Sequence, residues 1–600
     1  MTSAPTRLKS GSIDEGLANG QRLLETSPAA AALQARALLR VEPHNTAAHR
    51  LFAKAMAALG NDEEARLARA RAVQFSREVE AIADAHQAVK SGRPAGAETI
   101  LQEHLARFPD DPVALRILGE ALAQKGDTAG AVRCLREALA FMPEYVDARV
   151  ALVALCQRNF DQVAALAALE PLLSERPADI PLLRWKASLL SNLDEHEAAA
   201  EILQRLVAAH PENAELHVAL GDEWRTLGRP EAAYEAYRSA VRCAPLQGQA
   251  WWGLAALAQR PFDEGDRAQL ESALAQVPKA DPGRPHLHFA LGVAHEQQGD
   301  LGAAFRQFSA GNALRSKGFK PDGTAAEVAA GRKVFSAAFF AAREGAGCPA
   351  SDPIFIVGMP RSGSTLVEQI LAGHSRIEAT AELPIIPVLA RTLAARLGLR
   401  PGDPCFERLE EVPPPEFAEL GEEYLRLASP HRKTDKPHFI DKLPHNWADL
   451  GLIRLILPAA RIIDVRRAPL DCCWSNFRML FARGHPASNS LEGMAAFYRH
   501  YVSAMTHWDE VQPGFVRRVI YEKLIDDFEA EVRRLAEGLG LPFEPAMLEF
   551  HRHSRAVATA SAEQVRRPLN RAGIGAWRAY REWLGPLVDA VGSLEQTYAD

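Results

Sequence analysis

The sequence PIFIVGMPRSGSTL, in the second half of this 600-residue chain, has the residue types and spacing of a phosphate-binding loop. Four residues separate Gly358 from Gly363, and Thr365 follows, as in the G-x-x-x-x-G-K-[S/T] motif, whose backbone N–H groups surround nucleotide phosphates. Ser364 takes the place of the motif's lysine, which disfavours transfer of a γ-phosphoryl group. Arg361 instead brings a positive charge into the loop, and its guanidinium can bind a phosphate through two hydrogen bonds.

A strand and a helix are expected to position this loop. Residues 353–358 are rich in β-branched and aromatic side chains, and apolar residues recur with helical spacing after Ser364. A helix that begins directly after the loop directs its N-terminal N–H groups and the positive end of its dipole at a bound phosphate.

Three further strands are predicted at 438–442, 461–465 and 516–520. Strands that alternate with helices favour a parallel sheet covered on both faces, and such sheets bind ligands at the carboxyl ends of their strands. Four side chains lie just past predicted strand ends: Arg361, Lys442, Arg467 and Tyr521.

The loop sequence PRSGSTL resembles the 5′-phosphosulfate-binding loop of sulfotransferases that use 3′-phosphoadenosine 5′-phosphosulfate (PAPS). It is most similar to the protein-tyrosine sulfotransferases and their bacterial relatives with tetratricopeptide repeats. Arg467 with Ser475, eight residues later, resembles the family's 3′-phosphate element, and Tyr521 its adenine-side tyrosine. The resemblance therefore implies PAPS as donor and these binding residues: Arg361, Ser362, Gly363, Ser364, Thr365, Arg467, Ser475 and Tyr521.

The resemblance also implies a set of catalytic residues. Glu382 stands 21 residues after Arg361, at the spacing of the catalytic glutamate in tyrosylprotein sulfotransferases, and is the expected base. Lys442 resembles the lysine that neutralises the bridging oxygen of the departing 3′-phosphoadenosine 5′-phosphate (PAP), where charge develops in the transition state. Ser561 resembles a late serine that contacts the sulfonate, and Arg361 completes the set.

Two features leave alternatives open. His374 and His445 compete with the glutamate as base, since cytosolic small-molecule sulfotransferases use histidine. Ala576 stands where relatives usually carry Lys or Arg for the cofactor phosphate, and three residues are candidates to replace that charge: Arg567, Arg571 and Arg578. No metal is required by this scheme, and the sequence has no C-x-x-C, H-E-x-x-H or EF-hand spacing.

The N-terminal half is predicted to be a helical repeat array. Residues 112–145 and 214–245 share small, large and proline residues at the same offsets, and both match the tetratricopeptide period of about 34 residues. About seven or eight units are expected, enough to bury a continuous core. The predicted fold class is α plus α/β: a tetratricopeptide α-solenoid over 1–315, a connecting helix and linker over 316–352, and a P-loop-like parallel-sheet sulfotransferase domain over 353–600.

Composition limits the partners and the location. A net charge of −7 gives no overall positive field that would attract nucleic acid. The sequence contains no run of 18 apolar residues, so no membrane span is predicted. Seven scattered cysteines do not form a disulfide framework and favour a reducing compartment, so a cytoplasmic protein is expected. A peptide or protein acceptor held by the solenoid is the expected partner, and a homodimer is compatible with the sequence.

The predicted function is transfer of a sulfonate group from PAPS to a hydroxyl group, with protein or peptide tyrosine as the first acceptor. Three alternatives stay open at this point. They are a carbohydrate, lipid or small-molecule hydroxyl as acceptor, a P-loop kinase or NTPase, and a repeat scaffold with an inactive nucleotide domain.

Overall fold

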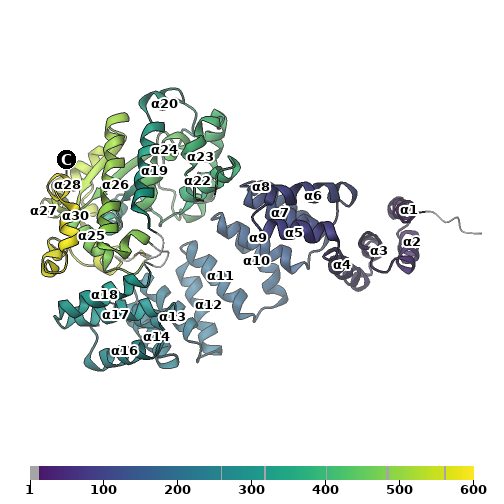
Figure 1. Ribbon diagram of the computed structural model, residues 1–600, viewed down its shortest axis with the longest axis horizontal. Coiled ribbons are helices and arrows are strands. Elements are labelled where there is room, and N and C mark those ends of the chain that lie inside the picture. Colours follow the sequence, from purple (N-terminus) through teal and green to yellow (C-terminus); the bar gives the residue numbers. More distant parts are fainter. Residues whose placement is uncertain are drawn as a thin grey trace, which may run out of the picture. The chain divides into compact units, whose positions relative to one another are not determined.

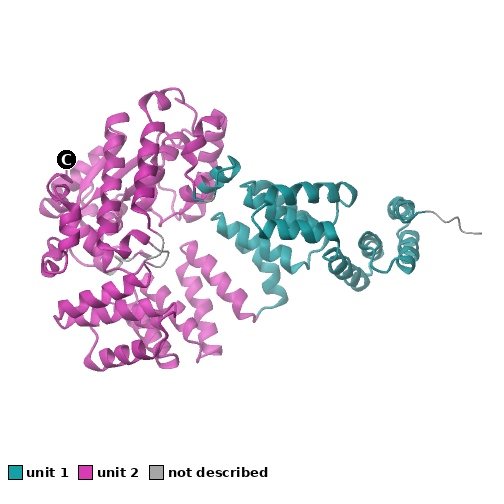
Figure 2. Ribbon diagram, viewed as in Figure 1, with its two compact units in different colours: residues 1–177, 391–402 teal, residues 178–390, 403–600 magenta. Residues whose placement is uncertain are grey.

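The structure is a computed structural model that describes residues 12–257, 260–315, 319–400, 402–481, 485–553, 555–557, 559 and 562–599. The chain forms two compact units, coloured separately in Figure 2. Unit 1 comprises Met1–Pro177 with Arg391–Gly402, and unit 2 comprises Ala178–Ala390 with Asp403–Asp600. The units divide the chain within the repeat array, so the domain boundaries predicted at 315 and 352 stay a prediction.

Unit 1 consists of antiparallel helix pairs. Its helices are α1 (Ile13–Thr26), α2 (Pro28–Val41), α3 (Thr46–Ala58), α4 (Asp62–Ser76), α5 (Glu80–Lys90), α6 (Pro94–Arg107), α7 (Pro112–Gln124), α8 (Thr128–Phe141), α9 (Val146–Arg158) and α10 (Gln162–Glu175). Unit 2 has helix pairs of its own at its start: α11 (Ile180–Asn192), α12 (His196–Ala209), α13 (Ala214–Thr226), α14 (Pro230–Cys243), α15 (Gly248–Ala255), α16 (Glu264–Gln276), α17 (Arg284–Gln297) and α18 (Leu301–Ala313) (Figure 1).

Small residues at fixed offsets let the helices of a pair approach closely. A Cβ atom on Gly221 of α13 would lie 2.6 Å from the Tyr237 ring of α14, and one on Gly292 of α17 would lie 2.5 Å from the Phe308 ring of α18. Only glycine fits at such a contact, because a methyl group there would overlap the ring. The predicted helical array is confirmed.

The second half of unit 2 is built on a five-stranded parallel sheet of order β2-β3-β1-β4-β5. Its strands are β1 (Pro353–Gly358), β2 (Ile377–Ala379), β3 (His438–Asp441), β4 (Arg461–Arg466) and β5 (Val516–Ile520). The predicted parallel sheet is confirmed, and the short β2 is an addition to it. Because β1 pairs with β3 on one side and β4 on the other, its carboxyl end lies where the strand order reverses.

Helices surround this sheet. Those before and between β1 and β4 are α19 (Pro321–Val334), α20 (Ala337–Ala341), α21 (Ser364–Ala372), α22 (Ile385–Arg396), η1 (Cys405–Glu411), α23 (Pro414–Ala428), η2 (Ser429–His431), η3 (Pro444–Asp449) and α24 (Leu450–Ile456). After β4 come α25 (Pro469–Phe477), η4 (Pro486–Asn489), α26 (Leu491–Val511), α27 (Tyr521–Asp526), α28 (Phe528–Gly538), η5 (Pro545–Arg552), α29 (Ala562–Val565), η6 (Ala576–Tyr580), α30 (Gly585–Val591) and α31 (Leu594–Thr597).

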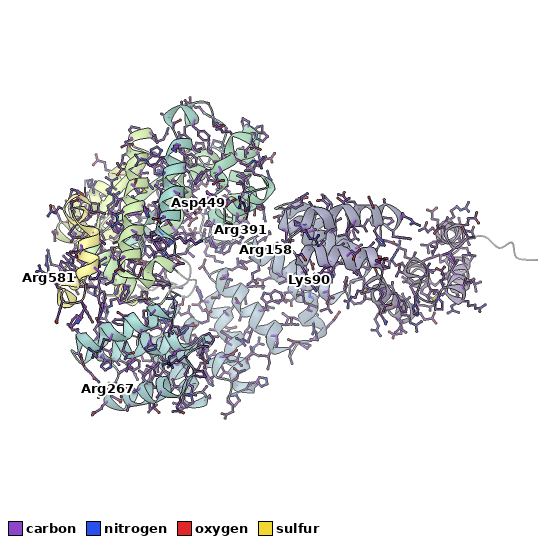
Figure 3. The ribbon with its side chains drawn as sticks, in the orientation of Figure 1. Lys90, Arg158, Arg267, Arg391, Asp449 and Arg581 are labelled. Atoms are coloured by element: carbon purple, nitrogen blue, oxygen red, sulfur yellow. The ribbon has the colours of Figure 1, made fainter. Side chains whose placement is uncertain are left out.

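The core of this part is continuous between the sheet and its helices. Ile354 and Ile356 of β1 and Ile463 of β4 are fully buried, and they join one apolar cluster with Val367 and Ile370 of α21. This burial explains why β1 is a nearly unbroken apolar run. Arg267 on α16 and Asp449 at the end of η3 mark the helical part and the sheet part of unit 2 in Figure 3.

None of the helices in the described part of the chain has the length and apolar character needed to span a lipid bilayer.

Candidate active site

The loop between β1 and α21 has the left-handed backbone that its glycines allow. Gly358 has φ +142° and Gly363 has φ +101°, and Gly363 caps the start of α21. A Cβ atom on Gly358 would lie 2.4 Å from the carbonyl oxygen of Val465, and one on Gly363 would lie 2.5 Å from the Tyr521 ring. Both positions therefore exclude a side chain, and the Tyr521 ring lies against the loop.

Arg361 lies at the tip of this loop in an unusual conformation. Its φ of +66° is rare for a residue with a side chain, and such backbone strain tends to occur at functional sites. Its Nε donates a hydrogen bond to Ser475 Oγ at 3.2 Å, and an Nη atom donates to Gln564 Oε1 at 3.1 Å. Burial, with the nearby charges of Arg467 and Arg478, lowers the pKa of the Arg361 guanidinium to about 10. An anion bound here would offset that repulsion.

Ser362 provides a test of whether a phosphate fits the loop. Its side chain is fully buried, and its hydroxyl has no hydrogen-bond partner among the described residues. Buried polar groups are normally satisfied, so this hydroxyl is suited to donate a hydrogen bond to an oxygen of a phosphate bound in the loop. Ser364 and Thr365 follow at the buried start of α21, where the first helical N–H groups have no intrahelical acceptor. The loop residues fit a phosphate or sulfonate group.

The predicted 3′-phosphate element closes over the same loop. Arg467 follows β4 and donates a hydrogen bond to the carbonyl oxygen of Arg361 at 2.9 Å and another to that of Gly573. Its guanidinium lies 5.2 Å from the centre of the Tyr521 ring. Its Nε atom is buried without a partner among the described residues, and Ser475 on α25 contacts Arg361. The structure thus brings together Arg361, Arg467, Ser475 and Tyr521.

Asp471, in the first turn of α25, is a residue that the sequence analysis did not single out. Its carboxylate accepts hydrogen bonds from the backbone N–H groups of Gly575 at 2.6 Å and Trp577 at 3.1 Å. Asp471 therefore holds the Gly575–Trp577 segment at the start of α25.

The predicted base and the predicted lysine form an ion pair. Lys442 Nζ lies 2.5 Å from Glu382 Oε1. The lysine follows β3 and its side chain is 1% exposed, whereas the glutamate side chain is 41% exposed. A buried ammonium needs a partner, and the exposed side of Glu382 leaves that carboxylate open to an incoming group.

Glu368 and Arg555 complete this cluster, and sequence reasoning missed both. Glu368, on the buried face of α21, has one carboxylate oxygen 3.8 Å from Lys442 Nζ and the other 2.6 Å from an Nη atom of Arg555. Arg555 also donates to the carbonyl oxygen of Thr380. The sequence did contain a signal for Glu368, because a glutamate interrupts the apolar pattern of α21. It contained no signal for Arg555, because Arg555 lies 187 residues from Glu368 in the sequence.

The histidines weighed as alternative bases have other surroundings. His374 is fully buried, contacts the carbonyl oxygen of Pro542 through Nε2 at 3.0 Å, and accepts a hydrogen bond from the backbone N–H of Arg376. His445, three residues after Lys442, has its ring centre 4.9 Å from that of His485. Burial lowers the pKa of His445, so its neutral form is favoured. His374 is occupied by its structural contacts, and His445 stays near the site.

The remaining predicted residues have mixed outcomes. Ser561 lies outside the described residues. Of the three candidates to replace the charge absent at Ala576, Arg571 forms an ion pair with Asp526 at 2.7 Å. Arg578 lies beside Gly575, where a Cβ atom would be 2.7 Å from its guanidinium. Arg567 is exposed. Within the described residues, no cluster of three or more His, Cys, Asp or Glu side chains could hold a metal ion.

Comparison with known proteins identifies the class of both parts. Residues 353–545 match the sulfotransferase family, and residues 88–156 and 186–248 match tetratricopeptide repeats. The chain therefore carries a sulfotransferase domain together with N-terminal tetratricopeptide repeats. A domain of this family supports the transfer of a sulfonyl group.

Particular relatives are more distant. The chain is 33% identical to an uncharacterized protein of Aquifex aeolicus (strain VF5) over 256 residues, which cover 41% of this chain and 33% of that protein. The match thus spans about a third of that relative's length. The chain is also 24% identical over 235 residues to a Caenorhabditis briggsae protein named "Putative protein-tyrosine sulfotransferase", which covers 37% of this chain and 80% of that protein.

Solved structures also resemble the chain. The sulfotransferase domain of the Synechococcus PCC 7002 olefin synthase matches with 21% identity and a TM-score of 0.32, covering 42% of this chain and 96% of that domain. The crystal structure of MamA matches with 20% identity and a TM-score of 0.22, covering 33% of this chain and 95% of that protein.

Proposed function

We propose that the chain transfers the sulfonate group of PAPS to a hydroxyl group, and that a tyrosine of a protein or peptide is the acceptor. The observation that carries this proposal is the pairing of Lys442 with Glu382 at 2.5 Å, at the end of the strand next to β1. A base and a leaving-group cation are thereby adjacent, beside a loop that fits a phosphosulfate.

The proposed reaction is a single in-line displacement. The acceptor oxygen attacks sulfur, the bond between sulfur and the bridging 5′-phosphate oxygen breaks, and PAP leaves with the electron pair of that bond. The acceptor proton passes to the carboxylate of Glu382. Lys442 stabilises the negative charge that develops on the bridging oxygen, and such stabilisation lowers the barrier because it acts mainly in the transition state.

This reaction requires the ion pair between Lys442 and Glu382 to open. In the closed pair the two charges face each other, so Glu382 must leave Lys442 to reach the acceptor hydroxyl. Glu368 remains as a buried counter-charge 3.8 Å from Lys442 when Glu382 turns to the acceptor. We expect the negatively charged donor to replace Glu382 as the partner of Lys442.

The other residues hold the donor in the proposed complex. Arg361, Ser362, Gly363, Ser364 and Thr365 would bind the 5′-phosphosulfate through side chains and backbone N–H groups. Three residues would bind the 3′-phosphate and adenine: Arg467, Ser475 and Tyr521. In the proposed complex, Arg361 and Lys442 supply the positive charge that Mg²⁺ supplies in a kinase. A metal chelator should therefore leave the rate of sulfonate transfer unchanged.

Two considerations support tyrosine as the acceptor. The spacing between Arg361 and Glu382 is that of the tyrosylprotein sulfotransferases, and one relative carries the name of such an enzyme. We further propose that the repeat array holds the acceptor polypeptide. The protein is proposed to work in the cytoplasm, where the seven cysteines of the sequence would stay reduced.

Calorimetric titration with PAP, ADP and Mg-ATP tests the donor, and assays with PAPS and several acceptors test the rest. We expect binding of PAP and sulfonate transfer to a tyrosine peptide. Transfer only to a carbohydrate, lipid or small-molecule hydroxyl would overturn the tyrosine assignment alone. Binding of Mg-ATP without PAP would indicate a kinase or NTPase. Binding of none of the three nucleotides would indicate a repeat scaffold with an inactive nucleotide domain.

A further inference from the structure

The turn between α13 and α14 of the repeat array bonds to the C-terminal part of the sulfotransferase half. Thr226, the last residue of α13, has a carbonyl oxygen that accepts hydrogen bonds from the backbone N–H of Val557 at 3.1 Å and from an Nη atom of Arg566 at 3.1 Å. Carbonyl groups in the last turn of a helix have no intrahelical donor, so these two bonds satisfy an otherwise open acceptor.

The turn contains a glycine, Gly228, and the absence of a side chain there leaves room for Arg566. Gly228 has φ +71°, and a Cβ atom there would lie between 2.8 and 2.9 Å from three atoms of the Arg566 guanidinium. Gly299 occupies the corresponding place between α17 and α18, with φ +81° and nothing within 4 Å of an added Cβ atom. The contact with Arg566 therefore belongs to the α13–α14 turn and does not follow from the positive φ of the repeat turn, because Gly299 has a similar φ without such a contact.

Arg566 connects this turn to both sides of the active site. The same guanidinium nitrogen lies 3.2 Å from the carbonyl oxygen of Arg555, whose side chain pairs with Glu368 in the cluster around Lys442. Two residues before Arg566, the side chain of Gln564 accepts a hydrogen bond from Arg361 at 3.1 Å.

From these contacts we infer that the Thr226–Gly228 turn positions the active site, with Arg566 as the linking residue. The turn holds Arg555 against Glu368, and hence Lys442, and holds Gln564 against Arg361. The repeat array is then a structural part of the catalytic half, in addition to any role in binding the acceptor. The inference rests on the proposed sulfotransferase function, because its effect is on the binding of PAP and on the transfer step.

The test compares Gly228→Ala with Gly299→Ala in the full-length protein. Both alanines adopt the same disfavoured positive φ, but only the first collides with Arg566. We expect Gly228→Ala and Arg566→Ala to lower kcat/KM for PAPS by about tenfold or more, since about tenfold is the effect of losing even one of the hydrogen bonds that the charged Arg566 guanidinium donates. Gly299→Ala should keep the wild-type value. Arg566→Lys should recover part of the loss, since an ammonium can still reach one carbonyl oxygen.

Hydrogen exchange gives a second measurement that does not depend on activity. The amide of Val557 donates to Thr226, so its protection should fall in Gly228→Ala and Arg566→Ala and persist in Gly299→Ala. Equal kcat/KM for Gly228→Ala and Gly299→Ala, or loss of Val557 protection without a change in kcat/KM, would overturn the inference. If the wild-type protein bound no PAP, the proposed function would fall first, and the inference with it.

Discussion

At the scale of single residues, Glu382 could act as the base or could hold Lys442 in place through their ion pair. A substitution of Glu382 distinguishes these two roles. In the proposed mechanism, Glu382 removes a proton from the acceptor. Glu382→Gln should therefore lower kcat by about 10²–10⁴, the usual contribution of a general base, with little change in PAP affinity. Initial rates with PAPS and calorimetry with PAP provide the two numbers. Glu549→Gln, which removes an exposed carboxylate paired with Arg552 at 2.8 Å, is the matched control.

An unchanged kcat in Glu382→Gln would remove this residue from the mechanism and leave His445 as the candidate base. A loss of both rate and PAP affinity would instead mean that the ion pair holds Lys442 in place for the donor.

Asp441, the residue before Lys442, predicts a pH dependence of stability. Burial raises the pKa of Asp441 from 3.8 to about 8, with a hydrogen bond from the Tyr424 hydroxyl at 2.9 Å opposing the shift. Between these values the folded protein keeps a proton that the unfolded chain releases. The free energy of unfolding contributed by this group therefore falls as pH rises from about 4 to 8, and levels off above that.

Asp441→Asn removes this titration. The melting temperature of the variant minus that of the wild type should increase steadily between pH 5 and pH 8. A constant difference over this range would mean that Asp441 is already ionised in the folded protein.

At the scale of elements, the loop after β1 depends on the left-handed backbone of Gly363. Alanine at this position has a disfavoured φ of +101° and a Cβ atom 2.5 Å from the Tyr521 ring. We expect Gly363→Ala to weaken PAP binding at least tenfold and to lower the melting temperature. Gly402→Ala is the matched control, since Gly402 has φ +99° with nothing within 4 Å. Similar PAP affinities for the two variants would exclude a close fit between Tyr521 and the loop.

The sequence predicted these elements better than the contacts between them. The loop, β1, β3, β4 and β5 carry local signals, namely glycine spacing and short apolar runs, and the structure confirms their parallel arrangement. The three-residue β2 is too short for a periodic pattern. Glu368 and Arg555 were missed because a buried ion pair between residues 187 apart leaves no local pattern. Ser561 and the roles of the site residues stay predictions.

At the scale of the whole molecule, unit 2 joins the last repeat to the helix that carries Ser475. Phe305 of α18 packs against three aromatic rings, those of Trp474, Phe477 and Trp583, each with its centre 6.1 Å away. Nearby, the carboxylate of Glu296 on α17 accepts hydrogen bonds from Arg478 at 2.6 Å and from the Tyr580 hydroxyl at 2.7 Å. The neighbours of Ser475 are thus held by the repeat array.

Phe305→Ala should therefore destabilise the full chain by about 2–3 kcal/mol, as expected for emptying a partly buried aromatic site. It should also weaken PAP binding, because α25 loses the packing that orients Ser475 toward Arg361. Denaturant unfolding and calorimetry measure the two effects. Stability lost with PAP affinity intact would show that α25 keeps its position without the repeat.

The repeat array contacts the sulfotransferase half at two separate places, and this has an evolutionary consequence. Thr226 on α13 and Glu296 on α17 belong to different helix pairs, and both hold residues of the same half. Inserting a helix pair between them would move the attachments apart by roughly 10 Å, the spacing of packed helices, and one of them would break. Homologues should accordingly vary in the number of repeats ahead of α13, while the count from α13 to α18 stays constant.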